Sequence, residues 1–410
     1  MNVTTAVETV VLEDTPERVI RYAQALSSRL TAIRAALYPP EARKTLRRFT
    51  TLEVAQLLGL SESSIRTLDL SGVGPEPQRL PNGRRAFTLD QINALRAHFA
   101  AKRSNPLESL DILPRRRPGD KLQAIAISNF KGGSGKTTTS VHLTHFLALQ
   151  GLRVLAIDLD PQASLTSMFG IQPEFDVGPN ETLYAAVRYD AERRPLAEVI
   201  RPTYFDGIDL VPANLELAEF EHDTPRALAA RDGAATLFFE RIARALGDVE
   251  DRYDVVVMDC PPQLGFLTLG ALFAATGVLV TVHPAMLDVA SMSQFLLMAG
   301  DLMAVVRDAG GRLDHDFLKF VLTRHDPNDH PQLHVVALLR SLFADAVLKH
   351  PVVETTAIAN AGIERKSLYE MEKSSIGRDT LARALESVDA VNAEVFDLMK
   401  AGWGRAGGAK

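Results

Sequence analysis

The stretch NFKGGSGKTTT, residues 129–139, decides the fold of this 410-residue chain. The apolar run before it, 122–127, is typical of a buried strand, and the run after it, 138–150, has the periodicity of an amphipathic helix. In a glycine-rich turn between strand and helix, backbone N–H groups and the helix N-terminus can surround phosphate oxygens. We therefore predict a phosphate-binding loop. The alternative, a surface turn that binds nothing, would leave the order of strand, loop and helix unexplained.

The residues of this loop have chemistry suited to a nucleoside triphosphate. Its glycines lack Cβ atoms, which lets the backbone close around phosphate. Lys136 can reach the β- and γ-phosphates, and Thr137 can place its hydroxyl on Mg²⁺. The nucleotide-binding residues that we predict in the loop are Gly132, Gly133, Ser134, Gly135, Lys136, Thr137 and Thr138.

The loop departs from the usual phosphate-loop pattern at two positions. Phe130 stands where a glycine is usual, and a second lysine, Lys131, precedes the glycine pair. This K-G-G-x-G-K-T form resembles the deviant Walker A loop of the ParA/MinD family of ATPases. The resemblance implies that Lys131 reaches across a dimer to the partner's nucleotide. It also implies that Lys131 and Lys136 both take part in catalysis.

Composition and charge narrow the class of protein further. The chain is 46% hydrophobic and 23% charged, and its net charge of −6 argues against a uniformly basic nucleic-acid binder. A single cysteine, Cys260, excludes an internal disulfide and a cysteine-held cluster, and we expect it to be buried as a small apolar residue. The polar start and the lack of an apolar run near about 18 residues predict a cytoplasmic protein without a membrane partner.

From Lys121 onward the chain alternates between strand and helix patterns. This alternation predicts a parallel sheet with helices on both faces, and several strands are continuous apolar runs, as in strands buried on both sides. The predicted strands are 122–128, 153–158, 207–211, 253–258, 277–282 and 316–323. The fold class is therefore α/β, a doubly wound, mostly parallel sheet of the P-loop NTPase type.

Acidic residues stand at the C-terminal ends of two of these strands. The second strand continues as DLDPQ, residues 158–162, and the fourth as DCPP, residues 259–262. The carboxyl ends of parallel strands are where α/β sheets bind ligands, so we expect both motifs beside the phosphate loop. An acidic residue after an apolar strand commonly holds Mg²⁺ through water. For the first motif the alternative is a surface turn with two carboxylates.

The stretches DLDPQAS and DCPP resemble switch I and switch II of the same family. The resemblance implies that Asp160 positions or activates the attacking water and that Asp158 supports it at the nucleotide site. It also implies that Asp259 and Thr137 hold the metal and that Pro261 lies at the nucleotide. The cofactors are then ATP and Mg²⁺, and the chain is an ATPase.

The residues before the phosphate loop fall into three predicted parts. Residues 1–40 contain a helical pattern from Thr15 to Leu37, which serves either as a dimer contact or as a helix packed on its own next domain. Residues 41–103 have an excess of basic side chains. Residues 104–120 are proline-rich and read as a linker, whose arginines at 115–117 either contact phosphate or are solvated. Residues 121–410 form the ATPase domain.

The basic segment predicts a DNA-binding fold. A capping box at Thr50 opens a helix at 51–58, Gly59 allows a tight turn, and a second helix runs from Ser61 to Leu70. Asn82-Gly83 indicates a hairpin turn, and a third helix ends near residue 101. The block resembles a MerR-like winged helix-turn-helix. The alternative is a small helical domain with a solvated basic face.

DNA contacts are expected from two regions. In a winged helix-turn-helix the second helix enters the major groove and the wing meets phosphates or a minor groove, which here singles out Ser63, Ser64, Arg66, Arg84 and Arg85. In ParA proteins the last segment carries a surface that binds DNA independently of its base sequence. The resemblance places Arg340, Lys366 and Arg378 there. The alternative for each of these three residues is an ordinary surface charge.

The C-terminal third gives weaker signals. The residues that contact the base stay open, with Thr323 and Asn360 as candidates. The last helix, 379–400, is amphipathic, and MinD proteins end in a membrane-targeting helix. Acidic side chains such as Glu394 and Asp397 would oppose an anionic membrane, so we expect a packing helix.

From Lys121 to about Leu398 the chain resembles a ParA-type partition ATPase, and its N-terminal additions are similar to those of the RepA proteins of repABC replicons. The resemblance implies an ATP-dependent homodimer that binds DNA nonspecifically at the nucleoid. It also implies stimulation by a ParB-type (RepB-like) partner and autorepression of the operon through operator DNA. One alternative is a transcription repressor that only senses ATP. A nitrogenase-type reductase would need bridging cysteines, and a MinD-like positioner would lack the winged domain.

Overall fold

The computed structural model describes residues 14–37, 44–70, 75–80, 83–103, 105–230, 237–372 and 377–405. It separates into two compact units, divided after Lys44. The first contains helix α1 (Thr15–Leu37), whose apolar side chains Val19, Ile20 and Leu26 are exposed. The helix predicted at 15–37 is thus present, and its role as a dimer contact stays a prediction.

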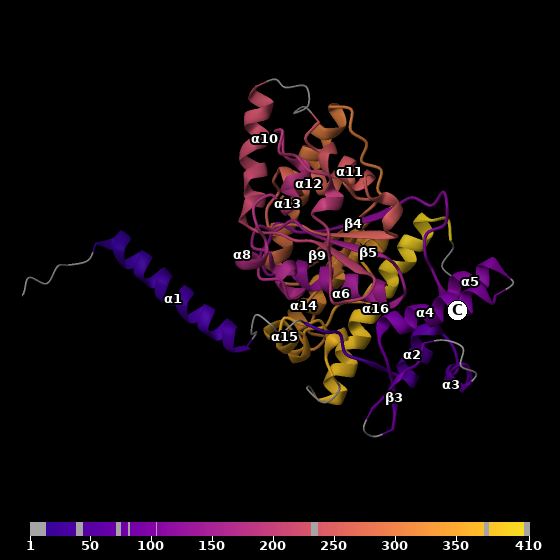
Figure 1. Ribbon diagram of the computed structural model, residues 1–410. Coiled ribbons are helices and arrows are strands. Elements are labelled where there is room, and N and C mark those ends of the chain that lie inside the picture. Colours follow the sequence, from indigo (N-terminus) through magenta and orange to yellow (C-terminus); the bar gives the residue numbers. More distant parts are fainter. Residues whose placement is uncertain are drawn as a thin grey trace, which may run out of the picture. The chain divides into compact units, whose positions relative to one another are not determined.

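The second unit is built on a seven-stranded sheet with the order β10-β9-β4-β8-β5-β7-β6. Figure 1 labels β4, β5 and β9 of this sheet. All neighbouring strands are parallel except the edge pair β6 and β7. The strands are β4 (Gln123–Ser128), β5 (Val154–Asp158), β6 (Arg201–Pro202), β7 (Ile208–Val211), β8 (Val255–Asp259), β9 (Gly277–Val282) and β10 (Phe317–Leu322). The six predicted strands are confirmed, and β6 is too short to leave a sequence pattern.

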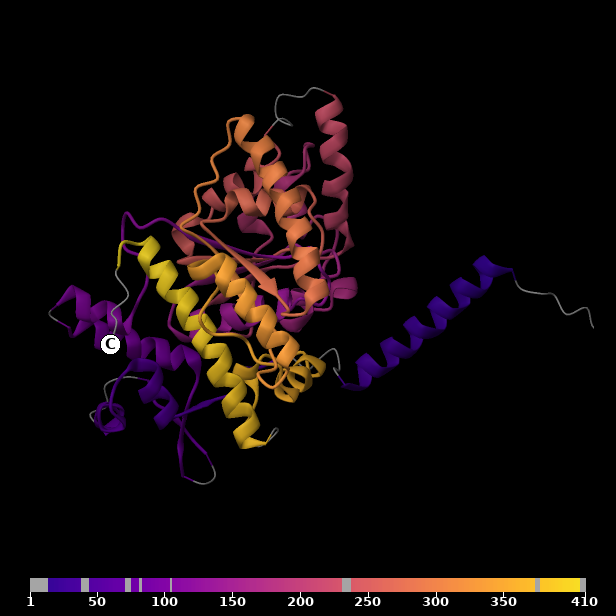
Figure 2. The same ribbon diagram turned by 180° about the vertical axis from the view of Figure 1, so that it is seen from behind.

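Alternate residues of the central strands enter two apolar clusters, one on each face of the sheet. Ile125 and Ile127 point to the face covered by α6 (Lys136–Leu149) and α16 (Arg378–Gly402). Ala124 and Ala126 point to the opposite face. That face is covered by α11 (Glu240–Gly247), α12 (Phe266–Ala274) and α13 (Met286–Asp308), as Figures 1 and 2 show.

Further helices connect these elements. They are α7 (Ser164–Met168), α8 (Pro173–Asp176), α9 (Tyr184–Val187), α10 (Glu219–Ala229), α14 (His330–Phe343) and α15 (Thr356–Ile363). In the described part of the chain they are accompanied by the 3₁₀ turns η1 (Leu196–Glu198), η2 (Leu215–Ala218), η3 (Glu250–Arg252), η4 (Ala344–Ala346) and η5 (Leu368–Glu370).

Two long helices bear on the expectation of no membrane contact. α16 buries Leu381, Val388 and Val395 in the core beside α6, which confirms the predicted packing helix. By length and composition alone, α13 could cross a membrane, contrary to the reading that no apolar run approaches that length. It buries Met292 and Phe295 against the sheet, while its apolar residues Leu287, Leu297 and Val305 are exposed.

A smaller group of elements precedes the sheet. It contains β1 (Phe49–Thr50), α2 (Thr51–Leu58), α3 (Glu62–Leu70), β2 (Gln78–Arg79), β3 (Arg85–Phe87) and α4 (Leu89–Ala101). Thr50 and Glu53 form the predicted capping box, and Gly59 ends α2 with a φ of 63°. β2 and β3 are antiparallel neighbours, as a hairpin requires. Asn82, predicted to form its turn, lies outside the described residues.

The stretch 104–120, expected to be a linker, is held against the rest of the unit. It contains helix α5 (Pro106–Ile112). Arg115 Nε donates a hydrogen bond to the Gly151 carbonyl at 2.9 Å, and Arg116 Nη1 donates to the carbonyls of Glu250 and Tyr253, each at 2.9 Å. These two side chains bind the chain itself, so neither a solvated linker nor a phosphate contact describes them.

Candidate nucleotide site

The loop between β4 and α6 forms a cradle of backbone. Gly133 and Gly135 have φ values of 76° and 88°, a region that side-chain-bearing residues rarely adopt. A Cβ on Gly135 would also lie 3.3 Å from the Cβ of Thr323. Lys136, the first residue of α6, is 7% exposed, and its Nζ donates to the Lys131 carbonyl at 3.1 Å. The predicted strand, loop and helix are therefore confirmed as a unit.

Side chains from the ends of β9 and β10 fix the shape of the loop. Asn129 Nδ2 donates to the Thr281 carbonyl at 2.5 Å, and the hydroxyls of Ser134 and Thr281 are 2.9 Å apart. Thr323 Oγ1 donates to the Ser134 carbonyl at 2.8 Å. Thr323 supports the loop and also lines the pocket above it, so its contact with the base stays a prediction. Sequence reasoning had not singled out Thr281.

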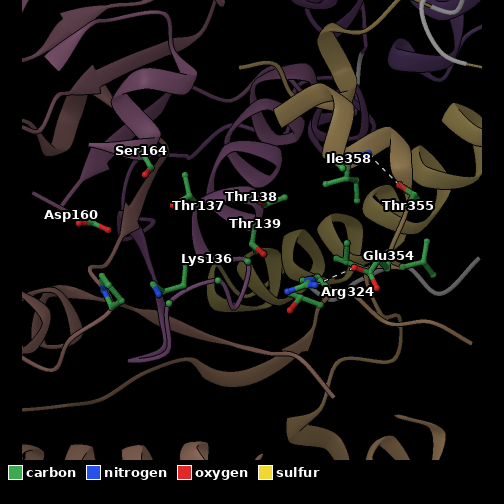
Figure 3. Close-up of a pocket in the computed structure, with 18 of the residues that line it drawn as sticks. Lys136, Thr137, Thr138, Thr139, Asp160, Ser164, Arg324, Glu354, Thr355 and Ile358 are labelled. Carbon is green, nitrogen blue, oxygen red and sulfur yellow. Dashed lines mark hydrogen bonds and ion pairs between the residues drawn. The ribbon is translucent and has the colours of Figure 1, made fainter. Parts of the chain in front are cut away.

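A pocket of about 550 Å³ lies over this loop (Figure 3). The predicted site residues that line it are Gly132, Gly133, Gly135, Lys136, Thr137, Thr138 and Asp160. The predicted nucleotide contacts that do not line it are Lys131, Ser134, Asp158, Asp259 and Pro261. Pro262 lines the pocket in place of its neighbour Pro261.

The end of the pocket away from the loop comes from residues that sequence reasoning missed. Val352, Val353 and Ile358 supply apolar surface there. Arg324 and Glu354 form an ion pair at 3.2 Å, visible in Figure 3, and Arg324 has a φ of 52°. Asn360 is exposed on α15 and is not among the residues that line the pocket, and its contact with the base stays a prediction.

A hydroxyl and a carboxylate meet beside the first turn of α6. Thr137 Oγ1 donates to Asp259 Oδ2 at 2.7 Å, and Ser140 Oγ donates to Asp259 Oδ1 at 2.8 Å. Burial raises the pKa of Asp259 to about 6, whereas the two hydroxyl donors and Lys136 favour its charged form. Burial also lowers the pKa of Lys136. The nearby negative charge of Asp259 acts in the opposite direction and raises it.

This pair fits Mg²⁺. The ion prefers oxygen ligands and usually takes few of them from protein, with phosphate and water completing its shell. Thr137 and Asp259 would hold it at the edge of the phosphate loop. No group of three or more His, Cys, Asp or Glu suited to a metal occurs in the described part of the chain, and a two-ligand site needs none.

Asp158, the first carboxylate of the stretch DLDPQ, stabilises the turn that carries the second, Asp160. Asp158 Oδ2 accepts from the backbone N–H and the hydroxyl of Thr166, at 2.8 and 2.7 Å, and Oδ1 accepts from the Asp160 N–H at 3.1 Å. Burial, with the charge of Asp259, raises the pKa of Asp158 to about 8. Asp158 is therefore a support without access to the pocket, and Asp160 is the carboxylate at the pocket wall (Figure 3).

The second lysine of the loop turns away from this pocket. Its ammonium group pairs with Asp288 in the first turn of α13. The other oxygen of Asp288 lies 2.7 Å from Nδ1 of His283, which follows β9. Lys131 therefore has no direct part in the pocket of its own chain, and a role across a dimer stays a prediction.

The residues predicted to contact DNA lie on the elements expected for them. Ser63 and Ser64 are in the first turn of α3, where both hydroxyls contact Ser61 Oγ, and the exposed Arg66 pairs with Glu62 at 2.7 Å. Arg84 and Arg85 lie where the chain enters β3.

Of the C-terminal set, Arg340 Nη2 donates to the Lys349 carbonyl at 2.7 Å and Lys366 pairs with Glu364 at 2.9 Å. Arg378 begins α16, and the position of its side chain lies outside what the structure describes. The DNA contacts of all eight residues stay predictions.

The chain is similar to a family model, to relatives in sequence and to solved structures. A family model described as an AAA domain matches residues 122–307. The chain is 50% identical over 383 residues to a replication protein A of Sinorhizobium fredii, a match that covers 93% of each chain. It is 31% identical over 274 residues to the chromosome-partitioning ATPase Soj of Thermus thermophilus, across 66% of this chain and 96% of Soj.

The fold is also similar to that of a solved enzyme. Cobyrinic acid a,c-diamide synthase from Mycobacterium smegmatis, with bound ATP analogue and magnesium, matches with a TM-score of 0.54 and 25% identity. The match covers 70% of this chain and 100% of the other.

Proposed function

We propose that this chain, which belongs like the RepA proteins of repABC replicons to the ParA-type, deviant Walker A partition ATPases, segregates a replicon through an ATP-driven cycle on DNA. It is an ATPase that uses ATP and Mg²⁺. The observation that carries the proposal is the convergence of Lys136, Thr137 and Asp160 on one pocket, with Asp259 behind Thr137.

Each of these side chains has a distinct part in hydrolysis. The loop N–H groups and Lys136 hold the β- and γ-phosphates, in place of the Lys131 carbonyl that Lys136 contacts in this structure. Mg²⁺, when bound by Thr137 and Asp259, neutralises charge on the phosphates. Asp160, at the pocket wall, orients the attacking water and accepts its proton. Asp158 keeps the turn of Asp160 in place.

We propose that ATP closes a homodimer in which Lys131 leaves Asp288 and binds the partner's phosphates. The Lys131 side chain is 42% exposed to solvent, which makes this exchange feasible. The apolar face of α1 is a second proposed dimer contact.

Two surfaces would bind DNA in this proposal. The group 41–103 would act as a winged helix-turn-helix that reads operator DNA and represses the chain's own operon, with α3 in the major groove and the β2–β3 hairpin as the wing. Arg340, Lys366 and Arg378 would bind DNA without regard to sequence in the ATPase domain, 121–410.

The proposal includes a partner and a location. A ParB-type (RepB-like) protein would stimulate the ATPase, and the chain would be cytoplasmic and associated with the nucleoid. The second candidate function, a repressor that only senses ATP, is supported by the helix–turn–helix elements alone and would make turnover unnecessary.

One experiment separates the two functions. ATP hydrolysis is measured with and without nonspecific duplex DNA and the ParB-type protein of the same operon. Partition predicts slow basal turnover that rises when both are present. A rate that neither addition changes, together with normal function of an Asp160→Ala variant in cells, would favour the ATP-sensing repressor.

A further inference from the structure

A single buried arginine joins the helix that leaves the phosphate loop to the helix–turn–helix group. Arg96 lies on α4 and is 0% exposed. Its Nη2 donates to the carbonyl of Leu149, the last residue of α6, at 2.7 Å, and to that of Leu57, in the last turn of α2, at 3.3 Å. One guanidinium group thus satisfies the C-terminal ends of two helices, where carbonyls lack partners and carry partial negative charge.

The surroundings of Arg96 are shaped to hold it in one place. Its Nη1 donates to Asn93 Oδ1 at 2.6 Å, and the amide of Asn93 is oriented by a second hydrogen bond, from Nδ2 to Asp206 Oδ2, also 2.6 Å. Gly151, just after α6, has a φ of 90°, and a Cβ there would lie 2.6 Å from Arg96 Cδ. The guanidinium therefore has little room to move independently of the end of α6.

The charge of Arg96 suits this position. Burial, with a smaller effect from the charge of Arg115, lowers the pKa of Arg96 to about 10, so the side chain remains cationic at neutral pH. A buried cation is tolerated when most of its donors are satisfied. Here two helix ends and one amide accept from the two Nη groups of Arg96, while its buried Nε has no hydrogen-bond partner among the described residues.

α6 has 14 residues, which corresponds to about 21 Å of helix. Its first residue is Lys136 at the phosphate loop, and its last is Leu149 at Arg96. A displacement of α6 when phosphate binds at its N-terminus would move the Leu149 carbonyl. Hydrogen bonds weaken steeply with poor geometry, so Arg96 would follow that carbonyl or lose its partner. Either response acts on the end of α2.

We propose that Arg96 is a positioning residue that couples α6 to the α2–α3 pair, so that a nucleotide at the phosphate loop changes the affinity of this pair for duplex DNA. The inference rests on the proposed function, because it needs both nucleotide binding and DNA binding by 41–103. It adds a route between them that runs through one side chain and needs no movement of the segment 104–120.

The test uses the full chain and a DNA duplex from upstream of its own gene. The dissociation constant is measured without nucleotide, with ADP, and with ATP and Mg²⁺. For the wild type we expect one nucleotide to change it at least about fivefold, the lower end of usual coupling between sites. In Arg96→Met, which keeps length but removes all donors, the ratio should fall to about one, with ATP turnover within about twofold of wild type.

A matched control is Arg115→Met. Arg115 donates to a carbonyl at the same turn, that of Gly151, but makes none of the bonds to α2 or α4 that Arg96 makes. This variant should keep the wild-type ratio. A wild-type ratio in a folded Arg96→Met protein, or equal loss in both variants, would overturn the inference.

Two milder variants decide the matter if Arg96→Met does not fold. Arg96→Lys keeps the charge but cannot reach two carbonyls with a planar fork. Asp206→Ala, at an exposed hydrogen bond, releases the amide that orients Arg96. Both should lower the ratio, and an unchanged ratio in both would refute the coupling.

If the wild type binds the duplex with a ratio of one, this inference alone fails; if it binds no duplex, the proposed function fails first.

Discussion

At the scale of single residues, Thr137, the proposed metal ligand next to Lys136, offers a sharp test. Thr137→Ala removes the hydroxyl that contacts Asp259, and we expect kcat to fall by roughly 10²-fold or more, because the phosphate-bound metal loses a ligand. Thr137→Ser keeps the hydroxyl and is the control. Turnover is measured across a Mg²⁺ titration. Equal activity of both variants would remove Thr137 from the metal site.

The second lysine predicts a separation of binding from dimerisation. Lys131→Ala should bind ATP nearly as well as wild type, since Lys131 does not line the pocket, but should stay monomeric with a slowly hydrolysed ATP analogue. Asp288→Asn removes its carboxylate partner yet leaves the lysine, so it should still dimerise. Sedimentation velocity measures both. A nucleotide-dependent dimer of Lys131→Ala would refute the role across the interface.

The buried carboxylate of Asp158 predicts a pH effect on stability. Its folded-state pKa of about 8 lies above the value of about 4 expected unfolded, so the folded chain binds the proton more tightly. Its contribution to stability is present below pH 4 and is lost as pH rises towards 8. The melting temperature of wild type should therefore fall relative to that of Asp158→Asn over this range. If the melting temperatures of wild type and Asp158→Asn changed equally with pH, the raised pKa could not be assigned to Asp158.

At the scale of elements, the sequence predicted what short-range patterns encode. Several of the strands from β4 to β10 are continuous apolar runs, and the sequence Thr50-x-x-Glu53 encodes the cap of α2. The far end of the pocket has no such signal. Val352 to Ala359 carry no motif, and only the fold brings them beside a loop more than 200 residues earlier.

The hairpin and the helix–turn–helix predict a DNA surface distinct from that of the ATPase part. Arg84→Ala with Arg85→Ala should weaken operator binding and lower its salt slope by about one per lost phosphate contact. Arg378→Ala should weaken ATP-dependent nonspecific binding and leave operator binding unchanged. Fluorescence anisotropy with operator and unrelated duplexes, at several salt concentrations, distinguishes them. Equal loss of both activities in both variants would contradict two separate surfaces.

At the scale of the second compact unit, two parts that the sequence separates, the basic segment 41–103 and the ATPase part, are packed together. Phe87 and Ile92 of the N-terminal group share one apolar cluster with Ile125 and Leu147 of the ATPase part. Composition suggested a linker at 104–120, because prolines and arginines are typical of solvated chain. The acceptors that take up Arg115 and Arg116 lie far away in sequence, at Gly151, Glu250 and Tyr253, so no local pattern could reveal them.

The central claim is that hydrolysis at this pocket resets a DNA-bound dimer. Asp160→Ala removes the water-orienting carboxylate but leaves Lys136, Thr137 and Asp259 to bind ATP. The decisive measurement follows ATP hydrolysis and retention on nonspecific DNA together, for wild type and Asp160→Ala, after free ATP is removed. The account predicts that the variant binds ATP, turns it over at least about 100-fold more slowly and stays on DNA while wild type dissociates. Loss of ATP binding, or release from DNA at the wild-type rate, would contradict it.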